Sequence, residues 1–239
     1  YAYCYRCAFN QKPESCNLEC AGYLEHVLED PHSGVAHPAA VLVEPIQGEG
    51  GSIVPPDGFM TRIRELCDAH DVLLITDEIQ AGFCRTGKMF AFEHSGIVPD
   101  IVTMSKALGG MGFPISGTAF KEELDTWTPG KHIGTFRGNV IAYAAGAAAI
   151  RFMTETALAD YALRLGSRMM TLLKEIERES ELVGECRGRG LMMGVELVSD
   201  KERKTPAPET AKAVRSACHR RGLMIEVGGH YNNVARFLP

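Results

Sequence analysis

The stretch 72–78, with the sequence VLLITDE, decides the fold class. A short apolar run that ends in acidic residues predicts a strand that is buried on both faces and has polar groups at its carboxyl end. Residues 39–44 and 100–106 repeat this arrangement, and residues 59–70 have the apolar spacing of a helix. Apolar strands separated by helices predict an α/β fold with a largely parallel sheet covered on both sides.

The second half of the chain has a different pattern. Two stretches rich in Ala, Met and Leu, 139–155 and 157–180, have helical spacing. Shorter apolar runs follow them, and together they predict a smaller α+β unit. The further expected elements are strands at 115–120, 191–198, 223–227 and 234–238, and a helix at 209–221. We therefore divide the chain into residues 1–150, part of a large domain, and residues 151–239, which hold the linker helices and an incomplete small domain.

The length and the two ends of the chain suggest an internal piece of a longer polypeptide. The 239 residues exceed the usual size of a single domain. The chain begins at Tyr1 without a signal-peptide pattern and stops at Pro239, within an apolar stretch. Because folded domains rarely end inside a strand, we expect further segments on both sides.

Composition excludes several classes of function. Lys and Arg total 25 and Asp and Glu total 30, which gives a net charge of −5 with no basic block. This balance argues against nucleic acid or an anionic membrane as a partner. The longest apolar run, residues 140–150, is well short of the roughly 20 residues that a membrane span needs. We expect a globular, cytoplasmic protein.

Half of the eight cysteines are grouped near the start of the chain. Cys4 and Cys7 are separated by two residues, and Cys16 and Cys20 by three. Four thiols at this spacing leave a structural zinc site open, but we interpret them as reduced, partly buried thiols. The eight histidines form no metal-binding pair, and no catalytic metal is predicted.

Polar residues follow three of the predicted strands. Glu44, Asp77 and Lys106 stand at strand ends, and the carboxyl ends of parallel strands open onto the ligand crevice. A lysine in an apolar crevice can act as a nucleophile that forms a Schiff base, and a buried carboxylate can balance a pyridinium cation. The alternative is a simple Asp77–Lys106 salt bridge. The glycine-rich segments 47–51 and 109–112 lack the spacing of nucleotide-binding loops.

The chain resembles the class III aminotransferases, which are pyridoxal-phosphate enzymes of fold type I. Four segments carry the resemblance: 44–51 (EPIQGEGG), 76–87 (TDEIQAGFCRTG), 99–108 (PDIVTMSKAL) and 134–139 (GTFRGN). They occur in the order and at the intervals of that family. Within it, the segments 3–7 and 132–139 are most similar to diaminobutyrate–2-oxoglutarate aminotransferases. The resemblance implies a mostly parallel sheet of the seven-stranded type, partial here, and a smaller C-terminal domain.

The resemblance also implies a cofactor site for pyridoxal 5′-phosphate. Lys106 would hold the cofactor and move the proton during catalysis, and Asp77 would keep the ring nitrogen protonated. Ile79 would pack against one face of the ring, and Gln80 would hydrogen-bond its phenolic oxygen. Thr135 would bind the cofactor phosphate of a neighbouring subunit, which implies a homodimer or a dimer of dimers.

Two further residues match the substrate site of the family. Arg236 would bind the substrate carboxylate, for which its planar fork is suited. Glu49 would pair with Arg236 when an ω-amine without a carboxylate there is bound. The implied reaction moves the terminal amino group of a diamino or ω-amino acid, with 2,4-diaminobutyrate as our first choice, to 2-oxoglutarate.

Other interpretations remain open. A racemase, an aminomutase or a decarboxylase would use the same cofactor and fold, and a truncated, catalytically silent module would serve only in assembly. Residues 1–38 contain neither the phosphate-binding Ser-Gly loop nor the ring-stacking aromatic residue of the family. The 239 residues alone are therefore expected to be an incomplete aminotransferase.

Overall fold

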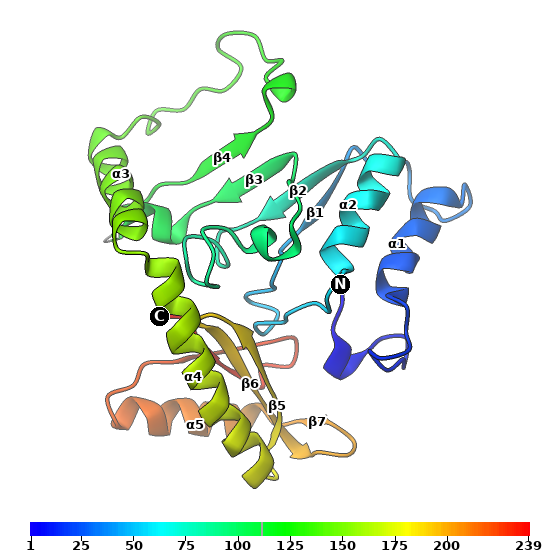
Figure 1. Cartoon of the computed structure of the whole chain (residues 1–239), viewed down its shortest axis with the longest axis vertical. Helices are drawn as coiled ribbons and strands as arrows, with labels where there is room; N and C mark the ends of the chain where they lie inside the picture. The colour runs from blue at the N-terminus through cyan, green and yellow to red at the C-terminus, as the bar shows by residue number, and fades with distance from the viewer. Residues whose placement is uncertain (111) are drawn as a thin grey trace.

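The computed structural model of the chain describes residues 1–110 and 112–239, and it contains two sheets (Figure 1). The first sheet has the strand order β1-β2-β3-β4, in which β1, β2 and β3 are parallel and β4 is antiparallel to β3. These strands are β1 (Ala40–Val43), β2 (Leu73–Asp77), β3 (Ile101–Met104) and β4 (Gly117–Phe120). All four correspond to strands that the sequence predicts. Each begins one or two residues later than its apolar run, and β2 continues beyond its run to Asp77.

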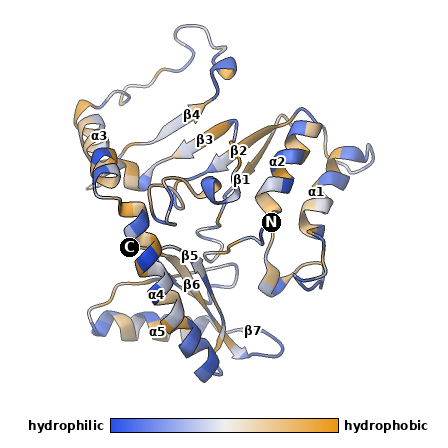
Figure 2. Cartoon of the chain, in the orientation of Figure 1, coloured by the Kyte–Doolittle hydropathy of each residue, from blue (hydrophilic) through white to orange (hydrophobic). Residues whose placement is uncertain are grey.

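Two helices, α1 (Glu19–Glu29) and α2 (Phe59–Ala69), pack beside one another and help to form the first core. In β2 the buried residues alternate along the strand, and Leu74 packs with residues of α2 such as Ile63 and Cys67. The opposite face is open over β1, where Leu42 is 64% exposed in a strand that Figure 2 shows as hydrophobic. The predicted cover on both faces of the sheet is therefore not found over β1.

The helices α3 (Val140–Glu155) and α4 (Leu158–Glu179) connect the first sheet to the second. Asn139 caps α3, because its side chain accepts hydrogen bonds from the amides of Ile141 and Ala142. Both helices were predicted to within one residue. The proposed division between residues 150 and 151 falls inside α3, and it stays a prediction.

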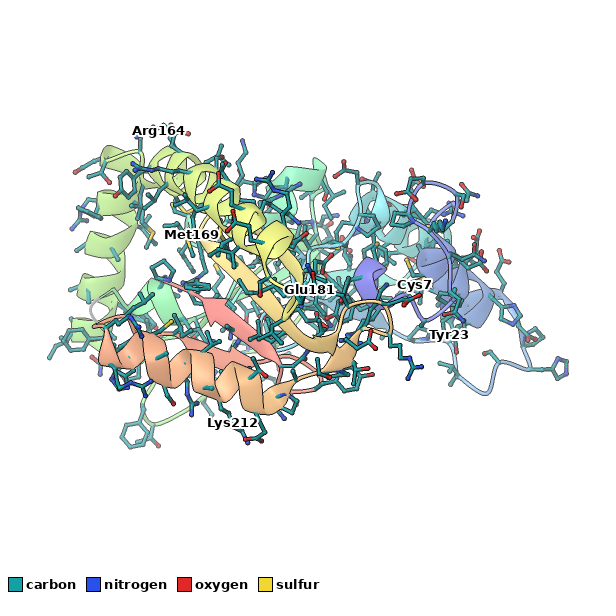
Figure 3. The ribbon with its side chains drawn as sticks, turned by 90° about the horizontal axis from the view of Figure 1, so that it is seen from below. Cys7, Tyr23, Arg164, Met169, Glu181 and Lys212 are labelled. Carbon is teal, nitrogen blue, oxygen red and sulfur yellow. The ribbon has the colours of Figure 1, made fainter. Side chains whose placement is uncertain are left out.

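The second sheet is antiparallel, with the order β5-β6-β9-β8, and β7 pairs with β6. Both α4 and α5 pack against it and share its core (Figure 3). Its elements are β5 (Val183–Arg189), β6 (Met192–Asp200), β7 (Thr205–Pro206), α5 (Pro208–Arg220), β8 (Glu226–Gly228) and β9 (Val234–Phe237). The remaining elements are short 3-10 helices: η1 (Cys4–Arg6), η2 (Ala91–Ser95), η3 (Lys106–Gly109) and η4 (Glu122–Leu124).

Two strands of this sheet, β5 and β7, were not predicted from the sequence. No strand is expected at 183–189, where Gly184 and Gly188 lower the strand propensity. In the structure β5 forms because it pairs along its length with β6. The short β7 lies between the strand expected at 191–198 and the helix expected at 209–221, where no strand is predicted. None of the helices in the described parts of the chain is long and apolar enough to span a membrane.

Candidate active site

A cavity of about 1000 Å³ collects four of the residues singled out by the sequence: Glu49, Gln80, Lys106 and Arg236. Lys106 follows β3 of the first sheet, and Arg236 lies on β9 of the second, so both sheets contribute. The remaining wall is mostly apolar and comes from α4 and the end of the chain. Its other lining residues are Arg85, Leu165, Arg168, Met169, Leu172, Leu191, Leu223, Met224, Ile225, Glu226, Phe237, Leu238 and Pro239.

Lys106 occupies the first position of η3. Only Ser105 separates it from Met104, where β3 ends. Its backbone has φ +45°, a left-handed conformation that is uncommon for residues other than glycine and is often found at functional sites. Among the described residues no carboxylate lies within salt-bridge distance of its amine, so the alternative of an Asp77–Lys106 salt bridge is not found. Ser105 anchors the turn by donating a hydrogen bond from Oγ to the carbonyl of Ile115 at 2.9 Å.

Asp77 is the last residue of β2, opposite Thr103 of β3. Its Oδ1 accepts a hydrogen bond of 2.9 Å from the amide of Ile79, which fixes the carboxylate at the strand end. Asp77 lines a neighbouring cavity of about 490 Å³ together with Glu44. Ile79 is half-buried and does not line either of these two cavities.

The pKa of Glu44, which follows β1, is affected by charged groups at the ends of β2 and β3. Burial raises the pKa of the Glu44 carboxyl, while a 2.7 Å hydrogen bond from the amide of Gly48 opposes this shift. The negative charges of Asp77 and Glu49 raise the pKa further, and the Lys106 amine lowers it. Asp77, Glu49 and Lys106 are therefore all close enough to Glu44 to affect the pKa of its carboxyl.

Gln80 and the turn after Gln47 are packed tightly together. The Gln80 amide donates from Nε2 to Glu49 Oε1 at 2.6 Å, and its buried Oε1 has no partner in the described part of the chain. A Cβ at Gly48 would lie 1.9 Å from Gln80 Oε1, so only glycine leaves room for this amide. The glycine-rich segment at 47–51 thus lets the backbone approach Gln80.

Arg236 is the most strongly paired residue of the cavity. Its guanidinium binds Glu49 through two bonds of 3.0 Å, and Nη2 also reaches Glu226 Oε2 at 2.8 Å. The Arg236 side chain is only 3% exposed, whereas that of Glu49 is 72% exposed. Burial raises the pKa of the Glu49 carboxyl, but hydrogen bonds from Gln80 and Arg236 outweigh it and lower the pKa overall.

Glu226 and Glu78 are carboxylates whose roles were not foreseen from the sequence. Glu226 is opposite Arg236 in the β8–β9 register, a cross-strand charge pair that only the strand pairing reveals. Glu78, next to Asp77, does not line the cavity, and it accepts hydrogen bonds of 2.9 Å from the amides of Ala91 and Phe92. Burial raises the pKa of Glu78 to about 7.

Thr135 is not part of this cavity. It lies in an exposed segment between η4 and α3, next to Phe136, which is 95% exposed. The structure therefore brings together Glu49, Gln80, Lys106 and Arg236, with Asp77 adjacent, and leaves Thr135 apart.

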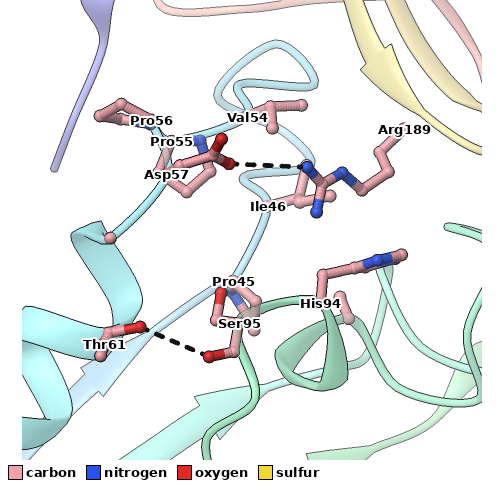
Figure 4. Close-up of a pocket in the computed structure, with 12 residues that line it drawn as sticks. Pro45, Ile46, Val54, Pro55, Pro56, Asp57, Thr61, His94, Ser95 and Arg189 are labelled. Atoms are coloured by element: carbon pink, nitrogen blue, oxygen red, sulfur yellow. Dashed lines mark hydrogen bonds and ion pairs between the residues drawn. The ribbon is translucent and has the colours of Figure 1, made fainter.

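A smaller pocket of about 220 Å³ is lined by residues 54–58 and by His94 and Arg189, among others (Figure 4). Arg189 Nη2 and Asp57 Oδ1 are 4.0 Å apart, and Thr61 Oγ1 donates to the Ser95 carbonyl at 3.4 Å. This pocket contains none of the residues predicted for the site.

The early cysteines Cys4, Cys7, Cys16 and Cys20 are free thiols, partly buried, and all line one small cavity. Within residues 1–110 and 112–239, no three His, Cys, Asp or Glu side chains are arranged to hold a metal ion.

Comparison with known proteins identifies relatives over the whole chain. The family model for class III aminotransferases matches residues 2–239. A diaminobutyrate–2-oxoglutarate aminotransferase of Haemophilus influenzae is 43% identical over 244 residues, which cover 100% of this chain and 54% of the relative. A leucine/methionine racemase of Thermococcus litoralis is 42% identical over 242 residues, covering 100% and 53%. The chain thus spans about half the length of the curated relatives it matches.

A solved structure gives the same result at the level of the fold. An aminotransferase of Bacillus anthracis superposes with a TM-score of 0.89 at 34% identity, covering 100% of this chain and 55% of that protein. The predicted α/β fold class is thereby confirmed.

Proposed function

The chain belongs to the class III aminotransferase family, and on this premise we propose that the protein containing it moves a terminal amino group to 2-oxoglutarate. The proposed donor is a diamino or ω-amino acid, with 2,4-diaminobutyrate first. The observation that carries this proposal is the two-bond pair between Glu49 and Arg236 in the cavity that also holds Lys106. Such a pair can mask a carboxylate-binding arginine while an amine without a carboxylate is bound.

Pyridoxal phosphate is the cofactor of this family, and the residues present fit it. The Lys106 amine opens on the cavity, and the buried Oε1 of Gln80 has no partner in the described residues. When bound, the cofactor supplies an aldehyde for the amine and a ring that accepts the electron pair released at carbon. Lys106 would hold the group, and Asp77 would provide the negative charge for a protonated ring nitrogen.

The chain's own residues provide acid–base chemistry and substrate recognition. A free Lys106 amine would take a proton from the substrate carbon and return a proton at the neighbouring position. Ile79 is proposed to pack on the ring, and the Gln80 amide to form a hydrogen bond with the phenolic oxygen of the cofactor. Arg236 is proposed to bind the carboxylate of 2-oxoglutarate through its fork after Glu49 has moved aside.

The exposed side chain of Glu49 supports this alternation. At 72% exposure it can rotate into solvent, whereas Arg236, at 3% exposure, is fixed in the wall of the cavity. Arg236 can then serve both substrates. Glu49 pairs with its positive charge while the amino donor is bound, and moves away when 2-oxoglutarate is bound.

We further propose that a homodimer completes the site. Thr135 lies outside the cavity on an exposed segment, as a residue that serves a neighbouring subunit would. Several apolar side chains of α3 and the preceding segment are also exposed, among them Phe136, Val140 and Ile141. Size-exclusion chromatography with light scattering tests this, and a monomer that is fully active would contradict it.

The decisive experiment mixes the intact enzyme with 2,4-diaminobutyrate and 2-oxoglutarate and measures glutamate. Formation of glutamate supports the proposal. Lys106→Ala is expected to remove the visible absorbance of the lysine-bound cofactor together with the activity. A covalent cofactor band that persists in Lys106→Ala would contradict the role of Lys106.

A second candidate is an amino-acid racemase, because the relative from Thermococcus litoralis is named for that reaction. A racemase needs the same lysine and ring but no amino acceptor. Loss of optical activity in an amino acid, without glutamate formation when 2-oxoglutarate is present, would favour it over transamination.

A further inference from the structure

A buried cluster of charged side chains lies behind the turn that carries Glu49. At its centre is Glu196 on β6, which is fully buried. Its carboxylate accepts a hydrogen bond from the Tyr3 hydroxyl, one of 2.5 Å from Arg6 Nε and one of 2.6 Å from Arg187 Nη1. Burial at this level requires such pairing, because an isolated charge in the protein interior is strongly unfavourable.

Arg187 on β5 joins this cluster to the turn. While Nη1 binds Glu196 and also Glu185 at 2.7 Å, Nε and Nη2 both donate to the carbonyl of Gly51 at 3.0 and 2.8 Å. The guanidinium also lies 4.9 Å above the ring of Tyr3. Because the guanidinium is planar and rigid, the carboxylates on one edge fix where its other edge can hold the carbonyl.

Gly51 closes the turn that presents Glu49. Its amide donates to the carbonyl of Gly48 at 3.0 Å, and its φ of +119° is accessible to glycine. A second anchor lies on Glu49 itself, whose backbone carbonyl accepts a 3.0 Å hydrogen bond from the amide of Gly229. The backbone of the turn is thus held to the second sheet at two points, while the Glu49 side chain remains exposed.

We propose that Arg187, oriented by Glu196, is a positioning residue that places Glu49 opposite Arg236. This rests on the function proposed above for the Glu49–Arg236 pair. The two parallel hydrogen bonds of 3.0 Å between Glu49 and Arg236 require a defined position of the Glu49 backbone relative to β9. Arg187 acts from β5, which β6 separates from β9 in the same sheet, so it sets that place without touching the substrate.

The two half-reactions should respond differently to loss of Arg187. The donor half-reaction needs Glu49 on Arg236, so a displaced turn weakens it. The 2-oxoglutarate half-reaction needs Arg236 uncovered, so it depends little on where Glu49 stands. In Arg187→Met we expect kcat/KM for the ω-amino donor to fall by about ten-fold or more, and that for 2-oxoglutarate to change by about three-fold or less.

The experiment compares the intact wild-type enzyme with Arg187→Met, Arg187→Lys and the control Arg189→Met. Arg189 is on the same strand, two residues away, and its nearest carboxylate is Asp57 at 4.0 Å. Each half-reaction is followed by rapid mixing at the cofactor absorbance. Hydrogen exchange in residues 48–52 is measured by mass spectrometry on the cofactor-free protein, as a readout that does not depend on turnover.

Selective loss of the donor half-reaction, faster exchange at 48–52 and partial recovery in Arg187→Lys support the proposal, provided Arg189→Met behaves as wild type. Equal losses in both half-reactions, or unchanged exchange at 48–52, would overturn it. If Arg187→Met does not fold, Arg187→Lys decides, because its single ammonium cannot hold Glu196 and Gly51 as a fork does. Failure of the proposed function is seen separately, as a wild-type enzyme that forms no glutamate.

Discussion

At the scale of single residues, Arg236 makes the ion pairs of the candidate site. Its side chain is buried, yet it contacts two largely exposed carboxylates, Glu49 and Glu226. A Cβ at Gly228 would lie 2.7 Å from Arg236 Nε, so the absence of a side chain there leaves room for the guanidinium. A rigid fork with exposed, movable counter-ions suits a site that binds a carboxylate in only one half of a reaction.

Replacing Arg236 by lysine keeps the charge and removes the fork. We expect Arg236→Lys to raise KM for 2-oxoglutarate by about 10- to 100-fold, because one of two parallel charge-assisted bonds is lost. Steady-state kinetics with varied 2-oxoglutarate measures this. Glu226→Gln serves as a comparison and should change KM much less, and an unchanged KM in Arg236→Lys would contradict the assignment.

Glu78 provides a pH-dependent prediction. Its pKa in the folded protein is about 7 against an ordinary value of 4.5, so the folded state binds the proton more tightly than the unfolded chain does. The resulting stabilisation is fully present below pH 4.5 and is lost as the pH rises through about 7. Relative to Glu78→Gln, the wild-type protein should lose up to about 3 kcal/mol of unfolding free energy over this range.

Urea unfolding of both proteins at several pH values tests the Glu78 prediction. The quantity of interest is the difference between the two unfolding free energies at each pH. A difference that stays constant across the range would show that Glu78 does not titrate in the folded protein as its burial suggests.

At the scale of elements, the second sheet depends on one very close contact between α4 and the β5–β6 turn. Gly166 of α4 packs against Gly190, and a Cβ at Gly166 would lie 1.9 Å from the Gly190 carbonyl oxygen. Gly190 in turn has φ +56° and packs against the backbone of Arg85 and Thr86. Three segments far apart in sequence therefore meet through backbone atoms that cannot move independently.

Alanine at Gly166 should be costly, although alanine favours helices. We expect Gly166→Ala to lower the unfolding free energy by about 2–3 kcal/mol, since the helix must move away from the turn. The matched control is Gly22→Ala in α1, where no atom lies within 4 Å of the added Cβ. That change should stabilise by about 0.5–1 kcal/mol. Thermal unfolding of both variants checks this, and equal shifts would refute it.

At the scale of the whole molecule, the first residues of the chain join the two sheets. The Tyr1 hydroxyl donates to the carbonyl of Pro45 at 3.1 Å, beside the first sheet. Tyr3 and Arg6 reach Glu196 in the second sheet. The sheets are therefore connected through a short N-terminal segment as well as through α3 and α4.

Removing the charge at Glu196 should destabilise this junction. Glu196→Leu leaves Arg187 buried without its main carboxylate, and we expect a loss of about 3–5 kcal/mol. Adding Arg187→Met removes the uncompensated charge, so the double variant should recover part of that loss. A double-mutant cycle by urea unfolding measures the recovery. Strictly additive losses would show that the two side chains are not coupled.

The sequence alone predicted the elements in which period and composition agree. The strands β1, β2 and β3 and the residues Lys106 and Asp77 follow from apolar runs that end in polar groups. The helices α2, α3 and α4 follow from the helical spacing of their apolar residues. β5 could not be predicted, because its glycines have low strand propensity and its stability comes from pairing with β6. The structure describes where the site residues lie, and the roles assigned to them stay predictions: Glu49, Asp77, Ile79, Gln80, Lys106, Thr135 and Arg236.

What the sequence determined by itself was the local pattern: buried parallel strands, their polar carboxyl ends and the ordered segments that indicate the family. Only the tertiary structure decided which side chains meet across the two sheets. Tyr3 and Glu196 are far apart in the chain, and so are Gly51 and Arg187, yet each pair is in hydrogen-bonding contact. The physical reason is that strand pairing and close backbone packing set these contacts, and neither is encoded in a local period.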